Sequence, residues 1–219
     1  MIGFIVIMLV YSWTGGMRAV AMTDVLQGIA MLVGIGALLT GVVTLTGGLG
    51  TLTTYLTETS PELVGVPGTT DAVNWLAMIV MIGFGAAVYP HAIQRVYSAR
   101  SERTLKRSLA LMAWMPLATT GVVFVVGIAG LQLFPGLDTG ASEQLVGLIA
   151  NEVAAQNTVF YLLMILLFGG VVCAIVSTAD SAVLAFSSIV AGDLYGRHVA
   201  PGATDRRKVL VGKLVGVAM

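Results

Sequence analysis

The sequence has little charge, one cysteine and two histidines among its 219 residues. A single cysteine excludes an internal disulfide, and two histidines argue against a histidine-rich metal site. Charged residues make up 10% of the chain, against roughly 25% in a soluble domain. The net charge of zero gives no sign of a nucleic-acid partner, and we expect none. What is abundant is apolar: 57% of the residues are hydrophobic and the mean hydropathy is +0.95, which predicts a membrane protein.

Four apolar runs are long enough to cross a bilayer as helices. They lie at about 23–46, 72–96, 108–134 and 158–191. Shorter apolar stretches at 1–13 and 209–219 resemble half-spans, so we expect the chain to be a piece of a longer protein. The sequence therefore predicts an all-α membrane protein, a single transmembrane unit over residues 1–219 with four complete transmembrane helices and two truncated ones.

The basic residues predict the orientation of these spans. All eleven Lys and Arg lie at Arg18, within 95–107 and within 197–213, whereas the alternate connections 47–71 and 135–157 contain none. By the positive-inside rule, the three basic connections are expected to be cytoplasmic. Residues 142–154 carry a helical apolar pattern, which predicts a short helix on the outer surface.

The stretch "CAIVSTADSAVLAFSSIVAGDLY", from Cys173 to Tyr195, places an acid inside the last long apolar run. A carboxylate such as Asp180 is costly at mid-bilayer, and hydroxyls surround it, among them Ser177 and Ser181. Two interpretations stay open: a structural hydrogen bond to a neighbouring helix, or a cation ligand. Hard cations prefer oxygen ligands, and helix spacing stacks Ser177 and Ser181 on one face, which favours the second interpretation.

Two further stretches combine polar residues with helix breakers. In "MIGFGAAVYPHAIQR", Met81 to Arg95, Pro90 cannot donate a backbone hydrogen bond and follows two glycines. This pattern is typical of a broken helix at a transporter site, and a simple proline kink is the alternative. In "YSWTGGMRAVAMTDVLQG", Tyr11 to Gly28, a Gly-Gly pair precedes Asp24 and Gln27, which lie one helical turn apart.

Together the three stretches resemble the sodium:solute symporter family, whose core is a LeuT-like five-plus-five inverted repeat. "GGMRAVAMTDVLQG" resembles the start of core helix 5, "PHAIQRVYSARS" the inner end of core helix 6, and "AIVSTADSAVLAFSSIVAGDLY" core helix 8. Their order and gaps match over essentially the whole chain. The resemblance implies that the chain holds a partial transporter core, from the end of core helix 4 to the start of core helix 9.

The resemblance also implies where cations bind. The family's shared sodium site takes a carbonyl and two hydroxyls from core helix 8, which correspond here to Ala174, Ser177 and Thr178. Its other half comes from core helix 1, which this chain does not contain. A second cation site, or the exit path, would use Asp24, Asp180 and Ser181. Asp180 stands where two-sodium branches have a hydroxyl, so this chain departs from their pattern.

The candidate substrate residues follow from the broken helix of the resemblance. They are Gly83, Phe84, Gly85 and Tyr89. Sugar and proline branches carry large aromatic or amide side chains in this helix, where this chain has Ile82, Gly85 and Ala86. The sequence is more similar there to the pantothenate and small-carboxylate branches.

The function implied is secondary active transport: symport of Na⁺ with a small solute, an organic acid or an amino acid, across the cell membrane. The expected partners are that substrate, the lipid bilayer and the remainder of the parent chain. The chain shows no nucleophile–base pair and no metal cluster of the kind an intramembrane enzyme needs, so we expect no enzyme. Two alternatives stay open: a non-transporting sodium-sensing or scaffold domain, and a proton-coupled transporter that uses Asp180.

Overall fold

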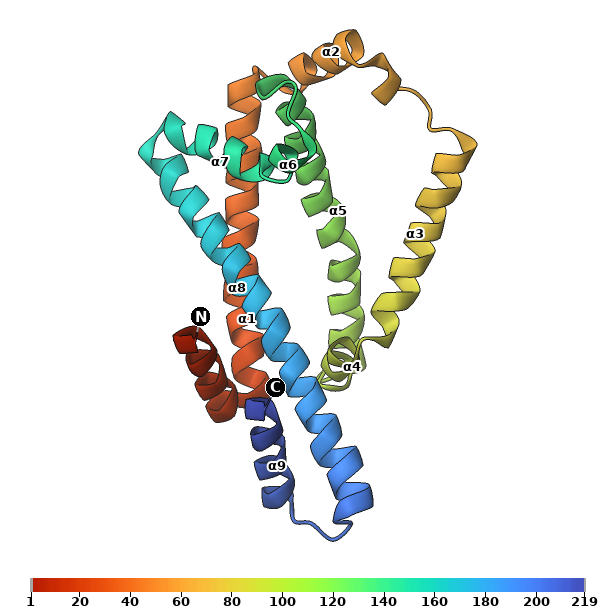
Figure 1. Cartoon of the computed structure of the whole chain (residues 1–219), viewed down its shortest axis with the longest axis vertical. Coiled ribbons are helices and arrows are strands. Elements are labelled where there is room, and N and C mark those ends of the chain that lie inside the picture. The colour runs from red at the N-terminus through yellow and green to blue at the C-terminus, as the bar shows by residue number, and fades with distance from the viewer. Residues whose placement is uncertain (1, 219) are drawn as a thin grey trace. The chain divides into compact units, whose positions relative to one another are not determined.

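The computed structural model describes the backbone of residues 2–218 and the side chains of 13, 15, 16, 18–85 and 88–218. Every regular element in these residues is a helix (Figure 1). In chain order the elements are α1 (Ile2–Thr46), α2 (Leu49–Thr59), η1 (Pro61–Leu63), α3 (Thr69–Val88), α4 (Pro90–Tyr97), α5 (Glu102–Leu133), α6 (Thr139–Ser142), α7 (Leu145–Gln156), α8 (Thr158–Ile189), η2 (Val190–Val199) and α9 (Asp205–Ala218).

Three of these helical segments are long and apolar enough to cross a membrane. They are Arg18–Thr46, Glu102–Leu133 and Thr158–Val199. The pair Thr69–Gly85 and Pro90–Tyr97 qualifies together as a fourth, bent by 56°. The four overlap the four apolar runs of the sequence, which confirms the all-helical membrane class. The bounds differ at α5, where the Ser101 hydroxyl accepts from the Thr104 N–H at 3.2 Å and starts the helix six residues before the apolar run predicted it.

α1 joins the first apolar stretch and the first long run, with a sharp kink between them at Gly16. This residue has φ 53° and ψ −151°, a conformation that glycine adopts without steric penalty. The Gly-Gly pair of the sequence therefore marks a change of direction between two helical pieces (Figure 1). The side chains of residues 1–12 lie outside what the structure describes.

The helix that the sequence predicted to break is interrupted at Tyr89, between α3 and α4. Tyr89 is extended, with φ −69° and ψ 121°, because the residue before a proline is disfavoured in the helical region. Pro90 then occupies the first turn of α4, where its missing N–H costs nothing. The chain thus ends one helix and starts another inside a single apolar segment. Ala86, named above for the substrate comparison, has its side chain outside the described part.

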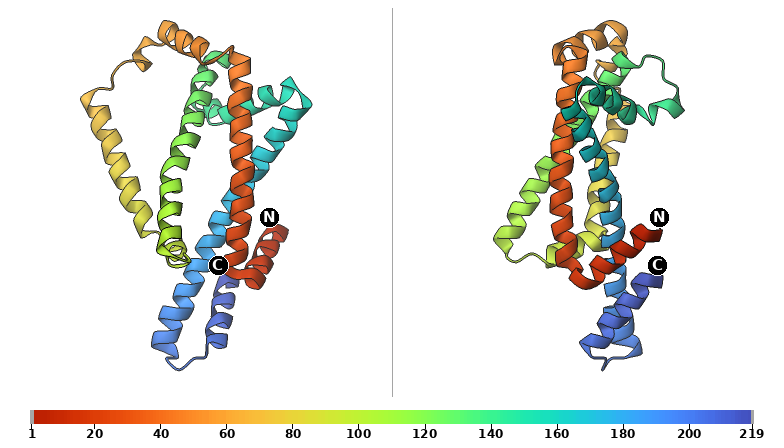
Figure 2. Two further views of the ribbon diagram at one scale, coloured as in Figure 1. Left: turned by 180° about the vertical axis from the view of Figure 1, so that it is seen from behind. Right: turned by 90° about the vertical axis from the view of Figure 1, so that its left-hand side faces the viewer.

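The chain divides into two compact units, which we describe separately. One comprises residues 28–75 and 106–171 and contains an apolar core of Leu38, Val42, Leu52, Val126, Ala129, Ile149, Ala150, Val153, Met164 and Leu167. Glycines let its helices approach closely, since a Cβ on Gly34 would lie 2.6 Å from the Leu167 Cβ. The short helices α6 and α7 lie beside the end of α1 in both Figures 1 and 2. Close packing of apolar side chains and glycines therefore stabilises this unit.

The other unit comprises residues 1–27, 76–105 and 172–219. Here α8 continues into wider π-helical turns at η2, and the chain returns as α9 alongside (Figure 2). Gly212 and Gly216 of α9 face Ala191 and Ser187, so small residues form this contact as well. The buried side chains of this unit include polar ones: Asp180, Ser181 and Ser187 are 1%, 7% and 6% exposed. This unit holds the candidate site.

Candidate functional site

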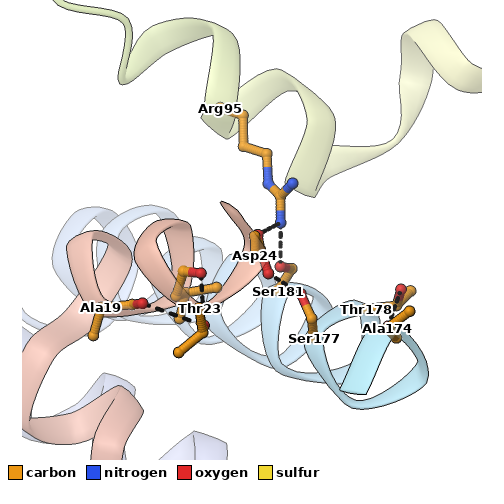
Figure 3. A network of polar contacts seen from close by, with 9 residues as sticks. Ala19, Thr23, Asp24, Arg95, Ala174, Ser177, Thr178 and Ser181 are labelled. Carbon is orange, nitrogen blue, oxygen red and sulfur yellow. Dashed lines mark hydrogen bonds and ion pairs between the residues drawn. The ribbon is translucent and has the colours of Figure 1, made fainter. Parts of the chain in front are cut away.

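An ion pair between Asp24 of α1 and Arg95 of α4 lies at the centre of the site (Figure 3). The Arg95 Nη2 lies 2.7 Å from the Asp24 Oδ2 and donates to the Ser181 Oγ of α8 at 2.8 Å. One guanidinium nitrogen therefore bridges an acid and a hydroxyl from two other helices. Charge-assisted hydrogen bonds of this length are among the stronger polar contacts in proteins.

The second carboxylate oxygen of Asp24 is engaged by α8. The Ser177 hydroxyl donates to the Asp24 Oδ1. Since Ser177 and Ser181 are four residues apart, helix geometry puts both hydroxyls on one face, and that face meets the carboxylate. The side chain of Asp24 is 20% exposed, whereas that of Arg95 is 49% exposed. The acid is thus mostly enclosed, and the base reaches it from a position open on one side.

Residues 173–178 of α8 supply further oxygen atoms. The Thr178 Oγ1 donates to the Ala174 carbonyl at 2.9 Å, a bond to residue i−4 that threonine often makes in helices. The side-chain amide nitrogen of Gln27 donates to the Cys173 carbonyl at 3.1 Å, and its amide oxygen accepts from the Ala174 N–H at 3.2 Å. Gln27 lies one turn after Asp24, so one face of α1 follows this part of α8.

These side chains line one pocket of about 330 Å³. Its described lining is Asp24, Gln27, His91, Arg95, Ala174, Ser177, Thr178 and Ser181. The structure therefore brings together five of the six residues that the sequence put forward for cation binding. Carboxylate, hydroxyl and carbonyl oxygens gathered in this way are the ligands that a hard cation takes.

Asp180, the sixth of these residues, lines a different pocket. It is 1% exposed and contributes to a pocket of about 400 Å³ whose lining includes Trp13, Lys208 and Lys213. Asp180 directly precedes Ser181, and consecutive side chains of a helix point about 100° apart around its axis. Asp180 therefore points away from the Ser181 hydroxyl, which lies on the face that meets Asp24. The Lys213 Nζ lies 5.9 Å from the centroid of the Trp13 ring in the same region. The two acids thus line different pockets.

The candidate substrate residues lie at the break between α3 and α4. Gly83, Phe84 and Gly85 belong to the last turns of α3, where the Phe84 side chain is 76% exposed. Tyr89 occupies the break, and its ring stacks on that of His91 at 5.5 Å between centroids. His91 also lines the pocket that contains Asp24, and it lies two residues after Tyr89 in the sequence. A stacked ring pair therefore connects the break to that pocket.

Arg95 is a pocket residue that the sequence did not put forward for the site. The sequence used it for the orientation of the spans and as the end of the broken-helix stretch, yet its side chain reaches the one acid among the described pocket residues. Its neighbour Gln94 donates to the Ser188 Oγ of α8, so two consecutive residues attach α4 to other helices. A signal was present: both lie within the first two turns after Pro90, inside the predicted span.

Several known proteins similar to this chain are named as symporters or cotransporters. A sodium/pantothenate symporter of Haemophilus influenzae is 27% identical over 203 residues, which cover 91% of this chain and 40% of that protein. A sodium/proline symporter of Escherichia coli is 28% identical over 215 residues, 94% of this chain and 41% of its own length. A sodium/glucose cotransporter of Vibrio parahaemolyticus is 25% identical over 243 residues, which cover 99% of this chain and 44% of that protein.

The chain spans about two fifths of the length of these relatives. Their identities to it are nearly equal, so the comparison does not separate the pantothenate, proline and glucose proteins. No solved structure matches the chain significantly. The model of one protein family, described as the sodium:solute symporter family, matches residues 1–219. The chain belongs to the sodium:solute symporter family.

Proposed function

We propose that this chain forms part of the core of a sodium-coupled symporter in the cell membrane, built as a LeuT-like five-plus-five repeat. The observation that carries the proposal is the gathering of Asp24, Ser177 and Ser181 around one pocket in a chain of this family. Sodium is a hard cation that oxygen ligands bind, and it acts here as the coupling ion. Its gradient drives transport because sodium binds the outward-open and inward-open states with different affinity.

Two groups of residues would bind sodium. Ala174, Ser177 and Thr178 would supply the helix 8 half of the shared site, through one carbonyl and two hydroxyls. The Thr178 Oγ1 lies 2.9 Å from the Ala174 carbonyl oxygen, and both residues line the pocket. Asp24 and Ser181 would form a second cation site or the exit path, where Ser177 also contributes. Asp180, which lines a different pocket, would influence sodium binding through its negative charge.

The substrate would bind at the break between α3 and α4. A small organic acid or an amino acid is the class we propose, because Ile82 and Gly85 leave this helix without the large aromatic or amide groups of the sugar and proline branches. Gly83 and Gly85 would allow a ligand to approach the backbone, and Phe84 and Tyr89 would supply apolar walls. The names of the relatives suggest the compounds to test first: pantothenate, proline and glucose.

The test is solute uptake by the full-length protein in proteoliposomes. Radiolabelled small carboxylates, amino acids and glucose are offered with and without an inward sodium gradient. We expect sodium-driven uptake of a small carboxylate or amino acid, and its loss in Thr178→Ala. Thr40→Ala is the matched control, since its hydroxyl also bonds a carbonyl four residues earlier, at 2.8 Å, but outside the pocket.

Three other outcomes would change the proposal. Sodium-driven uptake that survives Thr178→Ala with unchanged sodium affinity would remove sodium from this part of α8. Uptake driven by a proton gradient alone would favour the proton-coupled alternative through Asp180. Sodium binding without uptake of any compound would favour a sodium-sensing or scaffold role.

A further inference from the structure

We propose that the Arg95 guanidinium is an internal counter-ion of the Asp24 pocket that competes with the incoming cation and so sets its affinity. The inference rests on the proposed function, because it concerns the occupant of that same site. It assigns to Arg95 a role that opposes cation binding, whereas a residue that merely supports the fold of the site would favour binding.

The competition follows from which atoms are used. Arg95 takes one oxygen of Asp24 at 2.7 Å and the hydroxyl oxygen of Ser181 at 2.8 Å, through the same nitrogen. A cation bound by Asp24 and Ser181 needs lone pairs of these same two oxygens, directed at the same point in space (Figure 3). Guanidinium and cation therefore exclude each other sterically at this point.

Charge leads to the same conclusion. Among the described residues that line the pocket, Asp24 is the one acid and Arg95 the one permanently charged base. With Arg95 in place the pair is neutral, and a cation added beside it would leave an excess positive charge in a mostly enclosed site. Departure of Arg95 restores the balance. A large displacement is not required, since its side chain is 49% exposed and already borders open space.

The exchange also reaches the broken helix. Arg95 lies on α4, which begins directly after the break at Tyr89. When a cation replaces the guanidinium, α4 loses its link to Asp24 and Ser181 and keeps the neighbouring link from Gln94 to Ser188. Cation occupancy is thereby transmitted to the element next to the candidate substrate residues.

The experiment measures equilibrium binding of radioactive sodium to the purified full-length protein. In Arg95→Gln we expect sodium to bind about tenfold more tightly or more, because the variant removes the competing guanidinium contacts to Asp24 and Ser181, and one hydrogen bond to a charged group alone accounts for about tenfold. Arg100→Gln is the control, an exposed arginine of the same connection, and should leave the affinity unchanged. Arg95→Lys keeps the charge and should stay close to wild type. Unchanged or weaker sodium binding in Arg95→Gln, with wild-type binding intact, would overturn the competition and leave the proposed function standing.

A second measurement tests whether any change in sodium affinity comes from loss of the competing guanidinium itself. In Arg95→Ala, added methylguanidinium should raise the apparent dissociation constant for sodium without lowering the binding capacity, and it should have no effect on wild type. No effect on Arg95→Ala, or an equal effect on both proteins, would overturn the inference. Absence of sodium binding in wild type as well as in every variant would instead overturn the proposed function, and the competition with it.

Discussion

The two parts of α8 bury different kinds of side chain. Residues 158–171 contribute Met164 and Leu167 to an apolar core, whereas residues 172–189 bury Asp180, Ser181 and Ser187. Both parts belong to one helix and one apolar run of the sequence, so hydrophobicity alone does not distinguish them. The difference lies in what each part contacts: the first packs in an apolar core, whereas the second also contacts the charged group of Asp24 and the guanidinium of Arg95.

This contrast separates permanent packing from exchangeable contacts. An apolar contact in the first part is lost only if the helices part, because no ion can replace it. A polar contact in the second part, such as that of Arg95 with Asp24, can be exchanged for a contact with a cation at the same oxygen. Substitutions in the first part, or in the apolar unit that it belongs to, are therefore expected to change stability. Substitutions in the second part, or in the residues that line the pocket with it, are expected to change ion binding. The predictions below test this distinction, in order of expected effect.

The largest effect is expected from Asp24→Asn. It removes the charge that both Arg95 and the proposed cation require, and it leaves the guanidinium without its counter-ion. We expect apparent sodium affinity of the full-length protein to fall on the order of 10- to 100-fold, since the cation loses the one charged ligand among the described residues that line the pocket. Asp193→Asn is the control, because its pair with Arg197 at 3.5 Å lies on exposed side chains. Equal effects of the two variants would contradict a special role for Asp24.

Gly41→Ala should destabilise the apolar unit. A Cβ at this position would lie 2.3 Å from the Val153 Cγ1, so α1 and α7 must move apart. We expect the free energy of unfolding to fall by about 1–3 kcal/mol, measured by thermal or denaturant unfolding in detergent. Gly36→Ala on the same helix is the matched control, since nothing lies within 4 Å of its Cβ position. Sodium affinity should be unchanged in both, and a loss of affinity in Gly41→Ala would break the distinction.

Ser181→Ala should have a smaller effect than Asp24→Asn. It removes one of the two acceptors of Arg95, and it also removes a proposed cation ligand. Because both competitors lose a partner, the two losses offset each other, and we expect apparent sodium affinity to change by no more than about tenfold, the lower end of the value of one hydrogen bond to a charged group. Sodium binding isotherms for Ser181→Ala beside Ser142→Ala, whose hydroxyl donates to the Thr139 carbonyl away from the pocket, would measure this. A change as large as that of Asp24→Asn would show that Ser181 acts as a dominant ligand.

The smallest effect is expected from Thr44→Val in the apolar unit. The Thr44 hydroxyl bonds the Gln156 Oε1 at 2.8 Å on an exposed surface, so its loss should lower stability by about 0.5–1.5 kcal/mol. Unfolding experiments would detect this, and sodium affinity should be unaffected. If Thr44→Val altered ion binding more than stability, polar contacts outside the pocket would have to be included in the site.

Much of the fold and part of the candidate site could be predicted from the sequence. The spans follow from hydropathy, because a helix must be about 20 residues long to cross a bilayer. The break at Tyr89 follows from the chemistry of Pro90, and the shared face of Ser177 and Ser181 from their spacing of four. Each of these features depends on residues that are close together in the chain.

The partners of the site could not be predicted in this way. Arg95 lies 71 residues from Asp24 and 86 from Ser181 in the sequence, and its distance to them depends on how three helices pack. The separation of Asp180 from Asp24 likewise depends on which face of α8 meets α1. By itself the sequence determined the helices, their break and the oxygen-rich face, because these follow from local backbone chemistry and hydrophobicity. Only the tertiary structure decided which charge meets that face, because contacts between distant residues depend on the packing of whole helices.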